Sequence, residues 1–119
     1  MEEKGRFITK PLEKRIEAKR YRLSFALPGG ESEITEIKKT PVVIGSLEGA
    51  VDICVPEPGI SRLHARLEMA GGEITIEDLN SSNGTYVNDE PVFGKGKVPL
   101  KDGDMVRLAD RSYRLEIYG

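Results

Sequence analysis

The sequence contains no tryptophan, one cysteine and one histidine among its 119 residues. A single cysteine, Cys54, excludes an internal disulfide and a metal site built from several cysteines. A single histidine, His64, together with the lack of clustered carboxylates, disfavours a metal centre. We therefore expect neither a metal nor another cofactor. Because Cys54 lies between Ile53 and Val55, we expect it to be a small buried residue.

Long apolar runs are also missing. No stretch is long enough to span a membrane or to act as a signal peptide, so we expect a cytoplasmic protein that does not insert into membranes. The net charge is only −2, which gives no overall attraction to nucleic acid or anionic lipid. Residues 1–22 carry a net charge of +4 and the remainder −6. The basic part lacks interleaved aromatic residues, so nucleic acid is not an expected partner.

The scarcity of reactive residues also weighs against catalysis. A catalytic triad built on His64 would need a nucleophile, and Ser61 lies only three residues away on the same predicted strand end. That spacing does not form a nucleophile elbow. The Gly-Lys-Gly-Lys stretch at 94–97 lacks the spacing of a phosphate-binding loop, and no helix follows it. We therefore predict that the protein is not an enzyme and has no catalytic residues.

Alternating apolar and polar residues run through the chain from Tyr21 onward and predict short β-strands separated by turns. Strands are expected at residues 21–27, 31–37, 41–44, 52–55, 65–70, 73–78, 86–87, 91–93, 106–108 and 113–117. Ile34 and Ile37 fall on opposite faces of their strand, so a bulge or kink is expected there. Roughly ten short strands without a convincing helix predict an all-β fold, an antiparallel β-sandwich.

The first 19 residues differ from the rest. They are charged and irregular, and we expect a tail or linker at 1–19 followed by one domain at 20–119. The apolar residues Leu12 and Ile16 are four apart, so residues 12–20 could form a short helix, although so short a helix is marginal alone. Thr9 could be phosphorylated and fold back onto the loops of its own domain. The linker-like start also suits a module of a larger multidomain protein.

One predicted hairpin organises the candidate site. Its strands, 65–70 and 73–78, are joined by Gly71-Gly72, which is a hairpin signal. Polar residues lie at the far end of both strands: Ser61, Arg62 and His64 precede the first, and residues 80–85 follow the second. Antiparallel pairing brings these two clusters together at one end of the sandwich, where binding residues usually lie.

The residue types in the two clusters suit an anion. Ser61 and Ser82 offer hydroxyl donors, and the guanidinium of Arg62 matches the geometry of phosphate. The tight turn around Asn83 can point backbone N–H groups at a ligand. Each charge-assisted hydrogen bond of this kind contributes about 1.5–3 kcal/mol, so a few of them would support binding of a peptide.

These residues resemble the motifs of forkhead-associated (FHA) domains. The matching positions are Gly45, the run from Ser61 to Ala65 and the run from Asp78 to Asn88, with similar spacing between them. The resemblance covers about residues 20–118. It implies an eleven-stranded β-sandwich that recognises phosphothreonine in a peptide of a partner protein. A threonine-phosphorylated protein or peptide is therefore the expected partner.

The resemblance also implies roles for single residues. Ser61 and Ser82 would bond to the phosphate, Arg62 would help to hold phosphate or peptide, and Asn83 would bond to the peptide backbone beside the phosphothreonine. A second group would hold the loops in shape: Gly45, His64, Gly84, Thr85 and Asn88.

One position departs from the family pattern. FHA domains usually have Gly-Arg where this chain has Gly45-Ser46, and that arginine is a principal phosphate contact. Serine supplies neither its charge nor its fork, and losing one such contact of about 1.5–3 kcal/mol weakens binding about ten- to a few hundredfold. Arg62, or a lysine such as Lys38 or Lys39, could compensate. The leading hypothesis is a weakened phosphothreonine-binding module, and the alternative is a phospho-independent scaffold module on the same fold.

Overall fold

The computed structural model describes residues 19–119. The proposed role of Thr9 and residues 12–18 of the predicted short helix lie outside the described residues, and the last residue of that prediction, Arg20, begins a strand instead. Eleven strands form within them: β1 (Arg20–Ala26), β2 (Ser32–Ile37), β3 (Val42–Gly45), β4 (Ile53–Cys54), β5 (Ala65–Ala70), β6 (Glu73–Asp78), β7 (Thr85–Val87), β8 (Glu90–Pro91), β9 (Val98–Leu100), β10 (Met105–Leu108) and β11 (Arg111–Tyr118). Over this part of the chain, no helix has the length and apolar character needed to cross a membrane.

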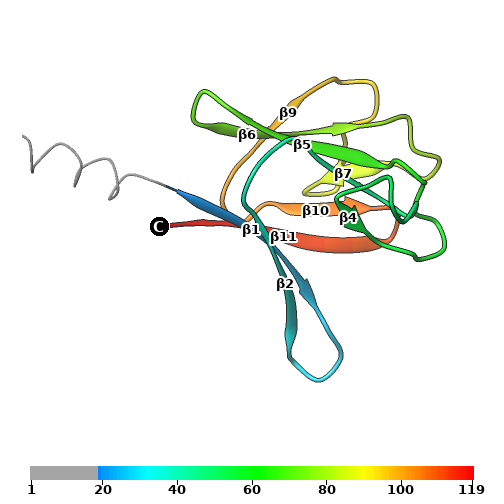
Figure 1. Cartoon of the computed structure of the whole chain (residues 1–119), viewed down its shortest axis with the longest axis horizontal. Coiled ribbons are helices and arrows are strands. Elements are labelled where there is room, and N and C mark those ends of the chain that lie inside the picture. The colour runs from blue at the N-terminus through cyan, green and yellow to red at the C-terminus, as the bar shows by residue number, and fades with distance from the viewer. Residues whose placement is uncertain (1–18) are drawn as a thin grey trace, which may run out of the picture.

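The strands form two sheets that pack face to face (Figure 1). One sheet has the order β2-β1-β11-β10-β7-β8 and the other β4-β3-β5-β6-β9. This architecture confirms the predicted β-sandwich. All pairs are antiparallel except β3 and β4, which run parallel, with Ile44 opposite Ile53. The hairpin of β1 and β2 projects from the body of the sandwich (Figure 1).

The core lies between the sheets and follows the predicted alternation. Leu23 and Leu115 face it from the first sheet, and Leu67 and Ile76 face it from the second, each 2% exposed or less. Burying an aliphatic side chain of this size contributes about 1.5–3 kcal/mol. The core therefore fixes the register of both sheets, because a slip of one residue would turn every apolar side chain toward solvent.

The structure differs from the predicted strands in two places. Residues 32–37 of β2 pair with 21–26 of β1 in an unbroken register, so the expected bulge is absent there. Ile34 instead points outward and is 44% exposed, while Ile37 is buried. Strand β9 was not predicted. Its three residues include Pro99 and pair only with β6 at the sheet edge, so they carry little alternation.

The prediction that Cys54 is buried is wrong. The residue is exposed, because β4 is a two-residue edge strand that directs Ile53 toward the core and Cys54 away from it. Its thiol donates a long hydrogen bond of 3.7 Å to the carbonyl oxygen of Ser46. An apolar run of three residues cannot distinguish an edge strand from a central one, which explains the error.

Candidate functional site

The β5–β6 hairpin brings the two polar clusters together, as the sequence predicts. Ala65 lies opposite Asp78 in the ladder, and just beyond this pair the N–H of Leu79 donates to the carbonyl of His64 at 2.9 Å. The end of β3 joins the same place, since the N–H of Ser46 donates to the carbonyl of Ser61 at 3.0 Å. Three loops thus meet at one end of the sandwich, and we call them the recognition loops: residues 45–52, 55–64 and 79–84 (Figure 1).

Ser61 connects two of these loops. Its hydroxyl oxygen accepts a hydrogen bond from the N–H of Ser82 at 2.9 Å. The hydroxyl proton of Ser61 has no acceptor among the described residues, so it is free to donate to a ligand. The side chain is half-buried, which leaves it accessible from the end of the sandwich.

His64 is a buried residue that links the same loops through hydrogen bonds. The side chain is fully buried. Its Nδ1 accepts a hydrogen bond from the N–H of Ser61 at 3.0 Å, and its Nε2 lies 2.9 Å from the carbonyl oxygen of Gly84. Since Nδ1 is an acceptor and a carbonyl can only accept, the proton lies on Nε2 and the ring is neutral. His64 therefore holds the backbone on both sides of the site and is not exposed to a ligand.

Asp78 organises the third loop, a role that sequence patterns alone do not assign to it. Its carboxylate accepts hydrogen bonds from the Ser81 N–H at 3.0 Å, the Ser81 hydroxyl at 2.6 Å and the buried Thr85 hydroxyl at 2.6 Å. Partial burial raises the pKa of Asp78, but the hydrogen bonds from Ser81 and Thr85 outweigh burial, so its pKa is lowered overall. The spacing Asp-x-x-Ser-x-x-x-Thr was the available signal.

Two glycines allow the close approach of these loops. A Cβ on Gly45 would lie 1.9 Å from the carbonyl oxygen of Arg62. Gly84 has a φ of 91°, and a Cβ there would lie 2.8 Å from the hydroxyl oxygen of Tyr86. Any side chain at either position would therefore displace backbone or a ring.

Asn88 differs from the other predicted loop residues: it lies at the far end of β7, where it bonds to Asp104 and Met105.

The outer surface of the recognition loops carries polar groups that the fold leaves open. Arg62, Ser82 and Asn83 are exposed, and Arg62 forms no ion pair within residues 19–119. The Asn83 amide donates to the carbonyl of Gly59 at 2.8 Å, which ties two recognition loops together. Among residues 19–119 nothing donates a hydrogen bond to its side-chain carbonyl oxygen, which can therefore accept one from a ligand.

Ser46 lies in the first recognition loop, directly after Gly45. Its side chain is half-buried beside Ser61 and carries no charge. Lys38 and Lys39 lie at the opposite end of β3 from Ser46, because both residues precede the strand and Ser46 follows it. The four residues of β3 separate them by about 13 Å along the strand.

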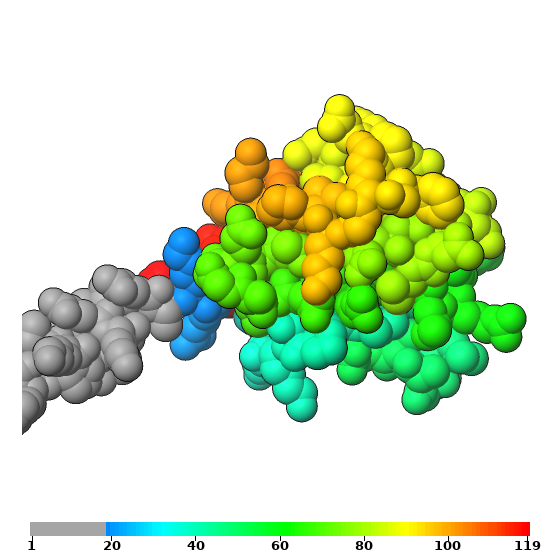
Figure 2. All heavy atoms as spheres, turned by 90° about the horizontal axis from the view of Figure 1, so that it is seen from above, coloured from blue at the N-terminus to red at the C-terminus, as the bar shows by residue number. Residues whose placement is uncertain are grey.

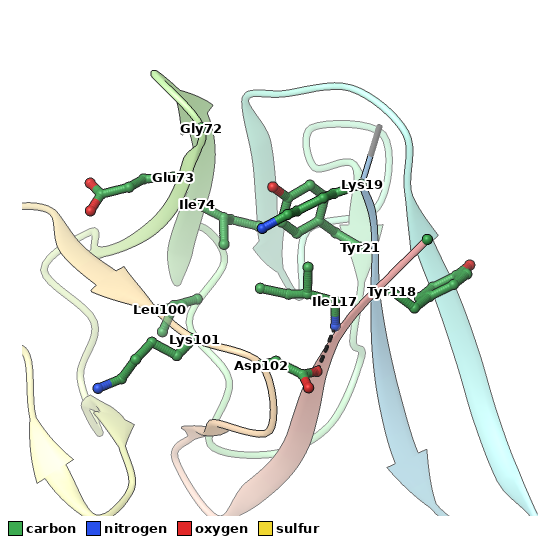
Figure 3. A pocket seen from close by; sticks show the side chains of 11 residues that line it. Lys19, Tyr21, Gly72, Glu73, Ile74, Leu100, Lys101, Asp102, Ile117 and Tyr118 are labelled. Atoms are coloured by element: carbon green, nitrogen blue, oxygen red, sulfur yellow. Dashed lines mark hydrogen bonds between the residues drawn. The ribbon is translucent and has the colours of Figure 1, made fainter. Parts of the chain in front are cut away.

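A cavity of about 620 Å³ lies at the other end of the sandwich (Figure 3). Apolar side chains from both sheets line it, among them Tyr21, Ile74, Leu100 and Ile117. The charged residues around it are two lysines and two acidic residues: Lys19, Lys101, Glu73 and Asp102. No recognition-loop residue contributes to this cavity. Figure 2 shows the start of β1 beside the C-terminal strand at one end of the molecule and the segments near residue 50 at the opposite end. Within residues 19–119, no cluster of three or more potential metal ligands occurs.

The comparisons with known proteins agree with this geometry. The model of the FHA domain family matches residues 42–109, which are more than half of the chain. An FHA domain-containing protein of Arabidopsis thaliana is 32% identical over 90 residues, which make up 75% of this chain and 23% of that protein. The chain thus spans about a quarter of the length of this curated relative.

Solved structures are similar as well. One, from a structural and functional analysis of phosphothreonine-dependent FHA domain interactions, is 27% identical with a TM-score of 0.71, covering 84% of this chain and 98% of that one. Mycobacterium tuberculosis EmbR in complex with a low affinity phosphopeptide is 29% identical with a TM-score of 0.71, covering 84% of this chain and 25% of that one. With the family model matched across both sheets and the recognition loops, the chain belongs to the FHA domain family.

Proposed function

We propose that this domain binds a phosphothreonine-containing segment of a partner protein through its recognition loops. The observation that carries the proposal is the bond between the Ser82 N–H and the Ser61 hydroxyl, which brings two serines together beside the exposed residue Arg62. Hydrogen bonds from such groups to a doubly charged phosphate are short and strong. The domain would act as a protein-interaction module and not as an enzyme.

The related structures support this function. One concerns phosphothreonine-dependent FHA domain interactions, and another contains a phosphopeptide bound to EmbR. In this chain, the intramolecular hydrogen bonds of Ser61 and Asn83 support the proposal, because each leaves one polar group for a ligand. Ser61 presents its hydroxyl proton and Asn83 its carbonyl oxygen.

We expect Ser46 to weaken the interaction. The missing arginine would have supplied a charged fork worth about 1.5–3 kcal/mol, equivalent to a ten- to a few hundredfold change in affinity. Arg62 is the remaining cation on this surface that is exposed and adjacent to Ser61. The proposed function is therefore a low-affinity phosphothreonine reader that depends on Arg62 for charge.

The test is titration of the purified chain with a degenerate phosphothreonine peptide library and its unphosphorylated counterpart, followed by NMR shifts of the recognition loops. We expect saturable shifts with the phosphorylated library alone. Arg62→Ala should weaken binding at least tenfold, and Ser46→Arg should strengthen it by a similar factor. Arg114→Ala is the matched control, because it removes an exposed arginine on β11, outside the loops. Equal binding of both libraries would contradict the proposal.

Ser46 also motivates the alternative function, a phospho-independent scaffold module on the same fold. In that case the partner would bind the loops or another face without a phosphate contact. Ser61→Ala and Arg62→Ala would then leave partner binding intact, and a large loss of affinity would exclude this alternative.

A further inference from the structure

Five large apolar side chains are exposed among residues 19–119, and two of them flank the proposed phosphate site. Leu47 follows Ser46 and is 42% exposed, while Leu63 follows Arg62 and is 47% exposed. Two others, Leu27 and Ile34, belong to the projecting β1–β2 hairpin and its turn. A single exposed leucine needs no explanation, but this pair occupies positions next to the site's polar residues on two different loops.

The backbone fixes the two leucines relative to Ser61. The N–H of Leu47 donates to the carbonyl of Arg62 at 3.4 Å, one step beyond the bond between Ser46 and Ser61. Gly45 packs against the same segment, since a Cβ on it would lie 3.1 Å from the Cα of Leu63. The loops that carry Leu47 and Leu63 are therefore in backbone contact, and both side chains are exposed on residues adjacent in sequence to the polar residues of the proposed site.

Because Ser46 stands where FHA domains usually have an arginine, this part of the loop surface carries less charge and is comparatively apolar. Ser46 supplies no cation, and its neighbour Leu47 exposes aliphatic surface in its place. Covering the exposed parts of two leucines with an apolar side chain of a ligand would raise affinity roughly tenfold. This tenfold gain in affinity matches the lower end of the ten- to a few hundredfold loss expected from the missing arginine. Because the contact is apolar, salt does not screen it.

We propose that Leu47 and Leu63 form an apolar contact surface that selects phosphothreonine segments with an aliphatic or aromatic side chain close to the phosphothreonine. This inference rests on the proposed function and specifies its partner class. The domain would then obtain from apolar burial part of the affinity that other family members obtain from a charged fork. Recognition would require the phosphate and the apolar neighbour together.

The test uses the full chain and two pools of phosphothreonine peptides. In one pool the positions flanking the phosphothreonine are drawn from Leu, Ile, Val, Met and Phe, and in the other from Ser, Asn, Gln and Thr. Unphosphorylated versions of both pools are measured in parallel. Wild-type protein should bind the apolar phosphorylated pool about tenfold more tightly than the polar one. The ratio should persist when the salt concentration is raised.

Variants assign this preference to residues. The double change Leu47→Ser and Leu63→Ser should bring the ratio of the two phosphorylated pools to about one. Ile34→Ser, which removes an equally exposed apolar side chain from β2, should leave the ratio unchanged. Ser46→Arg should strengthen binding of both phosphorylated pools without abolishing the ratio. Thermal unfolding of each variant verifies that the fold is kept, which surface positions allow.

The outcomes separate this inference from the proposed function. Phosphate-dependent binding with equal affinity for the two pools, or a preference that survives the double change, would overturn the apolar contact surface and leave the phosphothreonine reader standing. Binding that ignores the phosphate in every pool would overturn the proposed function and this inference with it.

Discussion

The two ends of the sandwich are stabilised in different ways. At the recognition loops, side chains such as His64 and Asp78 bond to backbone groups of neighbouring loops, and glycines let the chains touch. At the opposite end, apolar residues including Ile74 and Ile117 line an open cavity of about 620 Å³. Directional hydrogen bonds hold atoms at fixed positions, whereas apolar contacts tolerate small shifts. The opposite end also contains such bonds, since Asp102 accepts a hydrogen bond from the Ile117 N–H at 2.8 Å, but its apolar cavity wall includes no recognition-loop residue.

The largest difference in stability between the two ends of the sandwich is expected when a glycine is replaced by alanine. Gly45→Ala would place Cβ 1.9 Å from the carbonyl oxygen of Arg62, so we expect a loss of about 3 kcal/mol or more in the free energy of unfolding. Gly71→Ala is the matched control in the β5–β6 turn, where nothing lies within 4 Å and φ is 62°. It should cost only about 1 kcal/mol for backbone strain. Denaturant unfolding measures both, and equal losses would contradict the comparison.

An intermediate effect is expected for Asp78→Asn. The amide can replace only part of the acceptor capacity that Ser81 and Thr85 use, so we expect a loss of about 2 kcal/mol at neutral pH. The lowered pKa of Asp78 makes this contribution pH dependent. It is complete above the unfolded pKa of about 4 and is lost as the pH falls through the lower, folded pKa.

The pH profile of unfolding checks this assignment. The stability difference between wild type and Asp78→Asn should be constant near neutral pH and should shrink below about pH 4. A difference that stays constant down to strongly acidic pH would show that the Asp78 carboxylate is not the group that titrates.

The smallest effect is expected at the cavity. Ile117→Ala removes a half-buried side chain from the cavity wall, so we expect a loss of about 1 kcal/mol in stability. Affinity for a phosphothreonine peptide should change by less than twofold, because the cavity shares no residue with the recognition loops. Calorimetric titration measures the affinity, and a severalfold change would mean that the two ends are not independent.

Sequence patterns predicted the sandwich and the meeting of the polar clusters, because both depend on local alternation and on one hairpin. Leu67 and Ile76 alternate strongly with polar neighbours and fix the β5–β6 register. Edge elements were harder: β9 contains Pro99, and β4 is too short to show that Cys54 faces outward.

The hydrogen bonds within the site could not be predicted from the sequence, for a different reason. The bond from Asn83 to Gly59 joins residues 24 positions apart, and the three hydrogen bonds to Asp78 depend on the folded turn. Such contacts follow from the three-dimensional course of the loops. Residue spacing gives a signal for the bonds to Asp78 but none for the bond from Asn83. The roles of Ser61, Arg62 and Ser82 toward a phosphate stay predictions until a ligand is measured.

The position of His64 has a consequence for how this surface can change over evolutionary time. One imidazole bonds to Ser61 on one side and Gly84 on the other, so a substitution in either loop alters the conformational balance of both. Residues joined in one network show interaction energies instead of independent effects. Substitutions at Ser61 and Ser82, which are joined by the bond from the Ser82 N–H to the Ser61 hydroxyl, should therefore be epistatic, and the order in which they arise would decide which intermediates remain folded. The side chains of Leu47 and Leu63 cannot form hydrogen bonds, so substitutions at these positions can change the peptide preference without disturbing the hydrogen bonds of His64.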